Sequence, residues 1–280
     1  MLDIGGGFPV EYVQPIPSIE EFCAPIDRAL RRKIRPGIKI VCEPGRFISA
    51  SPVTLVCSVL GKSLRDGKMK IYNDEQFGLR TGDPRNFKTY EDVWNAYKMQ
   101  LENVVRHIMI QNYIAAGMKS KYIAAPLAST LHDLCMEHGR DLHTHAEYIP
   151  GALDASCIDG LGGFATCIDS LAAIKHLVYD TKKLTWDQLL EALERNWEGR
   201  EAIRQLCLNA PKYGNGIEWV DAIGYAIQRT VMEYAHAHPR PHGQSANMRI
   251  IPITFHNPCG KVTMATPNGR PAGEYLSDGI

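Results

Sequence analysis

The sequence has no Cys-x-x-C pair, although it contains eight cysteines. Cysteines at that spacing are typical of zinc sites and of thioredoxin-like redox sites, so their absence argues against both classes. Free cysteine is among the residue types most often buried in folded proteins. We therefore expect these thiols to be reduced and mostly buried.

The chain also lacks a net charge, a long apolar run and an apolar N-terminal signal. Its 31 lysine and arginine residues balance 31 aspartate and glutamate residues, which gives no basic surface for nucleic acid or an anionic membrane. No apolar run reaches the roughly 20 residues that a membrane-spanning helix needs. The first residues lack the basic start and apolar stretch of a secretory signal. We expect a cytoplasmic chain without nucleic-acid or membrane partners.

Two further catalytic classes find no support. No Gly-x-Ser-x-Gly nucleophile elbow occurs, which argues against a serine hydrolase of that type. The closely spaced histidines have no acidic or cysteine partner placed to complete a ligand set, so we expect no metal site. These histidines are His143, His145, His236, His238 and His242.

What the chain does contain is an ordinary globular composition, with 45% hydrophobic and 22% charged residues. The first 45 residues read as strand, helix and strand, which predicts a βαβ unit with a parallel sheet. The helix begins at an N-cap, Ser18, with a capping-box glutamate at Glu21. The expected elements are strands at 3–4, 38–42, 53–60 and 68–72 and a helix to Arg32, with turns at 5–9 and 36–37.

After about residue 76 the pattern becomes mostly helical. The spacing of the apolar residues predicts one long helix over Tyr90–Met118, with Val93, Tyr97, Leu101, Val104 and Ile108 facing inward. Further helices are expected at 127–138, 169–179, 186–197, 200–208 and 220–234, then a buried strand at 249–255 and a loop rich in glycine and proline to the end.

The first group of candidate site residues follows two of the predicted parallel strands. Gly5-Gly6-Gly7 would let backbone N–H groups approach a phosphate, and Gly45-Arg46 would add a charge-assisted contact. A buried Glu43 could keep a pyridine nitrogen protonated. Either motif alone is equally compatible with a tight turn and a surface arginine.

Together, the segments Leu2–Pro9, Cys42–Phe47 and Gly61–Lys68 resemble the pyridoxal-phosphate (PLP) dependent ornithine, diaminopimelate and arginine decarboxylases of the alanine-racemase-like fold. The resemblance covers about residues 1–74 and implies that Gly5, Gly6, Gly7, Glu43, Gly45 and Arg46 bind the cofactor. The lysine that holds PLP covalently in that family lies upstream of the glycine turn, where this chain has only Met1–Ile4. The later Cys-Asp substrate motif is also absent. We expect a phosphate cradle without a catalytic centre.

The second group comprises four motifs in residues 77–280. A Thr-Gly-Asp-Pro turn at 81–84 precedes the long helix, and Asp169–Lys175 begins another helix. The other two are Asn209–Asn215, with the sequence Asn-Ala-Pro-Lys-Tyr-Gly-Asn, and Pro267–Glu274, which contains Asn268-Gly269-Arg270. Capping, core packing and turn formation would explain each motif alone.

The order of the four motifs closely resembles the pyruvate-formate-lyase-like glycyl radical enzymes, nearer to the dehydratases, carbon–nitrogen lyases and arylacetate decarboxylases than to the formate lyase. The resemblance covers roughly 200 residues and implies an anaerobic lyase built on an α/β barrel. It also implies a small-molecule substrate, a glycyl radical installed by a separate S-adenosylmethionine-dependent activase, and a thiyl radical in a closed cavity. A homodimer is compatible with it.

The radical-bearing loops of that family have no counterpart in the sequence. We find neither a Gly-Cys-Val-Glu-like loop upstream of the Thr-Gly-Asp-Pro turn nor an Arg-Val-x-Gly-Tyr-like loop beyond Asn268–Arg270. Cys157 and Cys167 do not occupy the family's cysteine position. We therefore assign no catalytic residue.

The sequence as a whole predicts an α/β chain made of two pieces. Residues 1–75 would be part of a (β/α)8 PLP barrel, and residues 76–280 a helix-rich part of a glycyl-radical-enzyme barrel. By resemblance the chain is a glycyl-radical-type lyase, expected to be an incomplete fragment. The alternatives are a PLP-dependent amino-acid decarboxylase and a non-catalytic chimeric protein. Cut barrels expose sheet edges and apolar faces, so we expect a tendency to aggregate.

Overall fold

The structure is a computed structural model, and it describes residues 2–3, 19–33, 40–41, 68–69, 75–76, 78–122, 124–142, 157–160, 163–238, 247–250, 254 and 256–278. The chain divides into two compact units, Met1–Ser51 and Pro52–Ile280.

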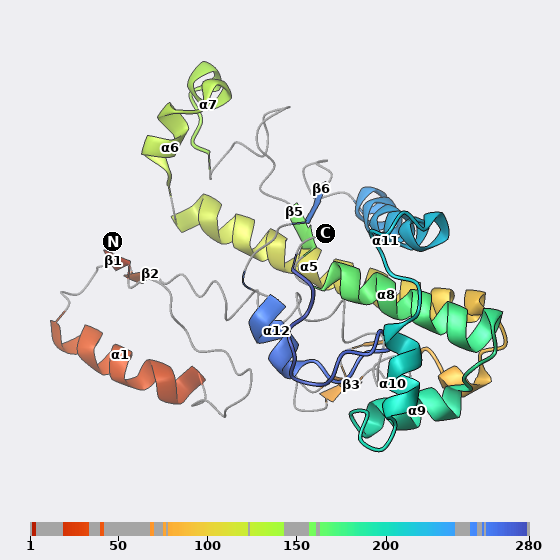
Figure 1. Ribbon diagram of the computed structural model, residues 1–280. Helices are drawn as coiled ribbons and strands as arrows, with labels where there is room; N and C mark the ends of the chain where they lie inside the picture. Colours follow the sequence, from red (N-terminus) through yellow and green to blue (C-terminus); the bar gives the residue numbers. More distant parts are fainter. Residues whose placement is uncertain are drawn as a thin grey trace. The chain divides into compact units, whose positions relative to one another are not determined.

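The first unit contains a strand–helix–strand motif. Strand β1 (Leu2–Asp3) and strand β2 (Ile40–Val41) pair in parallel, with Leu2 opposite Ile40, and helix α1 (Ile19–Lys33) lies between them in sequence (Figure 1). The predicted βαβ unit is therefore confirmed. The predicted N-cap, Ser18, lies outside the described residues.

The second unit is mostly helical. It begins with a short antiparallel pair, β3 (Lys68–Met69) and β4 (Glu75–Gln76), and a 3-10 turn, η2 (Pro84–Asn86). The remaining elements, in chain order, are α5 (Tyr90–Tyr122), α6 (Pro126–Thr130), α7 (Asp133–His138), β5 (Cys157–Gly160), α8 (Phe164–Ile174), the π-helix η4 (Lys175–Asp180), α9 (Trp186–Glu194), α10 (Glu201–Leu208), α11 (Glu218–Ala237), β6 (Asn247–Ile250) and α12 (His256–Val262).

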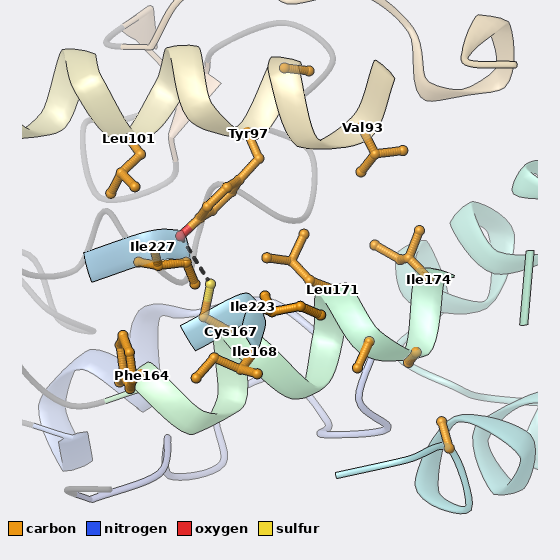
Figure 2. Packing of buried hydrophobic residues seen from close by; sticks show 14 of the residues in the cluster. Val93, Tyr97, Leu101, Phe164, Cys167, Ile168, Leu171, Ile174, Ile223 and Ile227 are labelled. Carbon is orange, nitrogen blue, oxygen red and sulfur yellow. Dashed lines mark hydrogen bonds between the residues drawn. The ribbon is translucent and has the colours of Figure 1, made fainter. Parts of the chain in front are cut away.

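The hydrophobic core of this unit lies between α5, α8 and α11. Figure 2 shows Tyr97 and Leu101 of α5 pointing toward Cys167 and Ile168 of α8, with Ile227 of α11 beside them. These side chains are at most 2% exposed. The long helix and its predicted inward residues Val93, Tyr97, Leu101 and Val104 are confirmed, while Ile108 is partly buried against the same core.

A two-stranded parallel sheet pairs the strand before α8 with the strand after α11. Strands β5 and β6 pair in register from Cys157 opposite Asn247 to Gly160 opposite Ile250. The strand expected at 249–255 is thus confirmed in its first two residues. It begins two residues earlier than expected, and positions 251–253 and 255 lie outside the described residues.

Three predicted helices were wrong in extent. The helix expected over 169–179 begins at Phe164 and continues from Lys175 to Asp180 as the π-helix η4. The single helix expected over 127–138 is two short helices, α6 and α7, separated by Leu131 and His132. The hydroxyl of Ser129 binds the carbonyl of Ala125 and the carboxylate of Asp141, and such side-chain bonds compete with a continuous helix. Helix α9 stops at Glu194 rather than Trp197, because Asn196 and Trp197 adopt left-handed backbone angles.

Helix α12 was missed altogether, because its sequence His-Asn-Pro-Cys-Gly-Lys-Val contains both proline and glycine. Pro258 lies in the first turn, where the absent N–H has no helical partner to lose. Gly260 is needed by packing: a Cβ there would lie 2.2 Å from the carbonyl oxygen of Glu274. Both residues therefore serve the helix rather than break it.

In the described part of the chain, no helix is both long and apolar enough to cross a membrane.

Candidate functional site

The residues expected to hold PLP lie outside the described residues. These are Gly5, Gly6, Gly7, Glu43, Gly45 and Arg46. Their positions in the sequence follow the carboxyl ends of β1 and β2, which pair directly. The carboxyl ends of adjacent parallel strands are the usual place for ligand-binding loops in α/β proteins.

The four motifs of the second unit are described, and each has a clear local role. The Thr-Gly-Asp-Pro turn is held by Gln100 of α5, which is 1% exposed. Its amide pairs with both backbone groups of Leu79, at 3.0 Å to the N–H and 2.5 Å to the carbonyl, and reaches the hydroxyl of Thr81. Asp83 caps η2 by accepting from the N–H of Arg85. The turn is thereby tied to the core helix.

The segment Asn209–Asn215 is bound to α8 through Asp169. The Asp169 carboxylate accepts a 2.8 Å hydrogen bond from the N–H of Tyr213, whose ring packs edge-on against Phe164. Burial raises the pKa of Asp169, and burial lowers the pKa of the neighbouring Lys212. The Lys212 ammonium donates to the Cys207 carbonyl at 2.8 Å. The second and third motifs are therefore in direct contact with each other.

The last motif contains a buried arginine with five described acceptors. Arg270 is 9% exposed, and its guanidinium donates to the Thr266 hydroxyl and to four backbone carbonyls. Those carbonyls belong to Thr263, Met264, Pro271 and Glu274. A cation removed from water needs such a set of partners. Residues 263–277 are here called the C-terminal loop. The Arg270 guanidinium lies at the centre of this loop and fixes its conformation through these hydrogen bonds.

The C-terminal loop is packed closely against neighbouring helices. Gly269 has a φ of +97°, and a Cβ there would lie 2.7 Å from the side chain of Leu208 in α10. Arg204, also in α10, donates to the Gly269 carbonyl at 2.9 Å. The glycine of the Asn-Gly-Arg sequence is therefore required both by its backbone angle and by its contact.

The far end of the loop is joined to the start of α8. The N–H of Ser277 donates to the Thr166 hydroxyl at 2.9 Å, and the Ser277 hydroxyl accepts from the Thr166 N–H at 3.0 Å. The Ser277 carbonyl also accepts from the N–H of Gly163 at 2.7 Å. No local sequence pattern marks Thr166 or Ser277, because the two residues are separated by 111 positions.

Two of the described cysteines, Cys167 and Cys207, are poor candidates for nucleophilic chemistry. Cys135, Cys167, Cys207 and Cys259 are buried, as expected, while Cys23 is half-buried. Cys167 contacts the Tyr97 hydroxyl at 3.2 Å, and burial raises its pKa to about 12 (Figure 2). Burial also raises the pKa of Cys207 to about 11. The thiols of Cys167 and Cys207 are therefore neutral at ordinary pH and weak nucleophiles.

Within the described ranges, no group of three or more histidine, cysteine, aspartate or glutamate side chains is arranged to hold a metal ion. The imidazole of His238 stacks on Tyr234 and bonds to the carbonyl of that residue at 2.8 Å. Positions 143, 145 and 242 lie outside the described residues.

An open groove of about 630 Å³ runs between α5 and α11, with Trp94, Lys98, Ala226 and Arg229 in its walls. None of the four motifs contributes a lining residue. We therefore place the candidate site at the C-terminal loop and the helices that hold it, and not in this groove.

Comparison with known proteins assigns a family to this arrangement. The sequence profile of pyruvate formate lyase-like proteins matches residues 48–260. A second profile, the pyridoxal binding domain of pyridoxal-dependent decarboxylases, matches residues 1–50. Both resemblances seen in the sequence are therefore matched by a family profile.

Several relatives are similar over most of this chain. Isethionate sulfite-lyase of Bilophila wadsworthia is 41% identical over 282 residues, which cover 99% of this chain and 34% of that protein. Trans-4-hydroxy-L-proline dehydratase of Clostridioides difficile is 35% identical over 228 residues, covering 79% of this chain and 28% of that protein. The chain spans about one third of the length of these curated relatives.

Solved structures agree with the sequence comparison. Hydroxyproline dehydratase from Clostridioides difficile superposes with a TM-score of 0.69 at 32% identity, over 81% of this chain and 28% of that chain. The B12-independent glycerol dehydratase from Clostridium butyricum gives 0.68 at 26% identity, over 80% and 27%. The chain belongs to the pyruvate formate lyase-like family.

Proposed function

We propose that residues 76–280 serve as part of a glycyl-radical lyase that removes water or sulfite from a small hydroxylated molecule. The similarity to isethionate sulfite-lyase and to the hydroxyproline and glycerol dehydratases supports this class of substrate. An S-adenosylmethionine-dependent activase as partner, and assembly as a homodimer, belong to the same proposal.

One observation carries the proposal: the four family motifs are joined through a single core. The Thr-Gly-Asp-Pro turn is bound to α5, and Asp169 of α8 binds the N–H of Tyr213. The C-terminal loop is bound to α8 through Thr166 and to α10 through Arg204. Turns with purely local roles would not need these connections between elements.

The residues present do not fit the radical groups themselves. The described buried cysteines are packed among other side chains, and the sequence has no Arg-Val-x-Gly-Tyr-like loop. We therefore derive no radical step from this chain. In our proposal the described unit is part of the scaffold of the lyase.

An exchange experiment tests the proposal. Residues 76–280 replace the aligned stretch of the Bilophila isethionate sulfite-lyase, and the exchange protein is activated anaerobically by the activase of that enzyme. We expect a glycyl radical signal in electron paramagnetic resonance and release of sulfite from isethionate, or of water from trans-4-hydroxyproline or glycerol.

The control is the same exchange protein carrying Arg270→Met. This substitution should disrupt the conformation of the C-terminal loop and abolish the glycyl radical signal. An unmutated exchange protein that folds with a native-like circular dichroism spectrum but gives no radical would refute the proposal. The same result would favour the alternative that this chain is a non-catalytic hybrid.

Residues 1–50 support a second candidate function, binding of PLP by its phosphate. The decarboxylase profile matches this segment, and β1 and β2 pair in parallel around α1. We propose Gly5, Gly6, Gly7, Glu43, Gly45 and Arg46 as the binding residues. PLP supplies an electron sink when bound, while Gly45 and Arg46 would bind its phosphate.

Titration of the full chain with PLP, followed by absorbance, tests this candidate. We expect saturable binding. Arg46→Ala should raise the Kd for PLP about tenfold, because the loss of one charge-assisted contact costs about 1.4 kcal/mol, whereas Arg28→Ala should leave the Kd unchanged. Arg28 belongs to α1 and is exposed. Borohydride reduction should leave no lysine adduct. A stoichiometric lysine adduct would support the decarboxylase alternative, and an absence of binding would refute the proposal that residues 1–50 bind PLP.

A further inference from the structure

The turn that follows α9 has an unusual backbone. Asn196 and Trp197 both have positive φ angles, +49° and +71°, although neither is glycine. A bulky residue rarely adopts this left-handed region, because its Cβ approaches the following carbonyl oxygen. Residues kept in such conformations tend to mark functional sites.

The surrounding structure holds this turn in place. The N–H of Trp197 donates to the Ala192 carbonyl at 2.8 Å, and the Trp197 carbonyl accepts from the N–H of Arg200 at 2.9 Å. Arg200 is in turn bound to Glu191 of α9 at 2.7 Å. The indole of Trp197 is 3% exposed, so core packing adds to these bonds.

Both residues of the turn bind the backbone of the C-terminal loop. The side-chain oxygen of Asn196 accepts from the N–H of Ala272 at 2.6 Å. The indole N–H of Trp197 donates to the Arg270 carbonyl at 3.1 Å. Asn196 itself is exposed and contributes no core packing, so its side chain acts mainly on the loop.

We propose that Asn196 and Trp197 are positioning residues, which set the path of the C-terminal loop at Arg270–Ala272 for the chemistry of the radical lyase. The inference rests on the proposed function, which it deepens. A small displacement of a supporting segment can reduce the rate of a reaction by about 100-fold, because the reacting groups must be held in a near-attack geometry.

A structural role and a positioning role predict different results for one substitution. Asn196→Gly removes the acceptor for the Ala272 N–H but suits the left-handed backbone, because glycine adopts it readily. The free energy of unfolding should therefore stay the same or rise, while the C-terminal loop is no longer held in place at Ala272. Asn196→Asp keeps an oxygen acceptor at the same place and is the conservative rescue.

The test has one readout on the full chain and one in the exchange protein. In the full 280-residue chain, we expect Asn196→Gly to keep its melting temperature within about 2 °C and to speed amide exchange at Ala272 about tenfold. In the exchange protein, we expect radical yield or kcat to fall about tenfold with little change in KM. Asn196→Asp should stay within about twofold of the parent in both.

Trp197→Phe extends the comparison, because it keeps an aromatic ring but removes the indole donor to the Arg270 carbonyl. We expect it to lower kcat in the exchange protein as Asn196→Gly does. If the parent exchange protein forms a radical and Asn196→Gly matches it in radical yield, kcat and Ala272 exchange, the positioning role is wrong while the proposed function stands. If the folded parent forms no radical, both fail together.

Discussion

Replacing Arg270 with methionine is the most informative single change in the C-terminal loop. Methionine keeps an unbranched apolar side chain, comparable to the aliphatic part of arginine, but removes the guanidinium. The substitution would remove the guanidinium donor from four backbone carbonyls and the Thr266 hydroxyl, and of these carbonyls that of Thr263 would keep its 3.2 Å bond from the Gly273 N–H. The loop would then have to open to water or keep buried acceptors unsatisfied.

The expected loss of stability follows from the burial of these bonds. The bonds to the Thr263 carbonyl and the Thr266 hydroxyl are buried, whereas those to Pro271, Glu274 and Met264 are partly buried. An unsatisfied buried acceptor costs about 1–3 kcal/mol, and water can reach the partly buried ones. We expect Arg270→Met to lower the free energy of unfolding by about 2–4 kcal/mol.

Urea unfolding followed by tryptophan fluorescence measures this effect. All four tryptophans lie in the second unit, and Trp197 contacts the Arg270 carbonyl directly. Arg195→Met is the matched control: Arg195 is 58% exposed and pairs with Glu191 at 3.2 Å, so its loss should cost about 0.5 kcal/mol or less. A loss below about 1 kcal/mol for Arg270→Met would refute the reasoning.

Three other substitutions test the remaining contacts. Gly260→Ala would place a Cβ against the Glu274 backbone and should cost about 2–3 kcal/mol in urea unfolding; Gly139→Ala, which meets nothing within 4 Å, should cost about 1 kcal/mol, and equal losses would contradict the packing argument. Gln100→Leu should speed amide exchange at Leu79 by removing its acceptor, and unchanged protection would show that the turn is held otherwise. Burial raises the pKa of Cys167 to about 12, above the ordinary value of 9.0. Folding therefore favours the neutral thiol, and this stabilisation is complete below about pH 9 and is lost as the pH rises toward 12. Between pH 9 and 11, Cys167→Ala should lose stability less steeply than the parent, by up to about 1.4 kcal/mol per pH unit, and parallel curves would be evidence against the shift.

Helical periodicity was a reliable guide where one face of a helix meets the core. In α5, Val93, Tyr97, Leu101 and Val104 recur at three- and four-residue intervals and are all buried. The same pattern located α11, which runs from Glu218 to Ala237 and extends the expected 220–234 at both ends. Periodicity works here because burial against neighbouring helices decides these positions.

Local patterns failed where distant contacts decide the conformation. Trp197 continued the helical pattern of α9, but its indole bonds to Arg270 and its backbone leaves the helix. Gly260 resembled a helix breaker, whereas its lack of a side chain admits the backbone of Glu274. In both cases the partner lies in the C-terminal loop, so no window of neighbouring residues contains the cause.

The candidate site was predictable in its members but not in its connections. Asn268, Gly269 and Arg270 were singled out from the sequence, and Asp169 with Tyr213 belonged to motifs also noted there. Their joining through Thr166, Arg204 and Ser277 depends on contacts across 44 to 111 positions. The division of the chain near residue 75, and the six residues expected to bind PLP, remain predictions.

The pairing of Thr166 with Ser277 also has a consequence for how the second unit folds. The two residues are separated by 111 positions, and the chain between them includes α8, α9, α10, α11 and α12. Closing so long a segment loses much chain entropy, which only already assembled helices can offset. We therefore expect the C-terminal loop to dock after the helices have assembled, and a protease added to the native protein to cut this loop before it cuts a helix of the core.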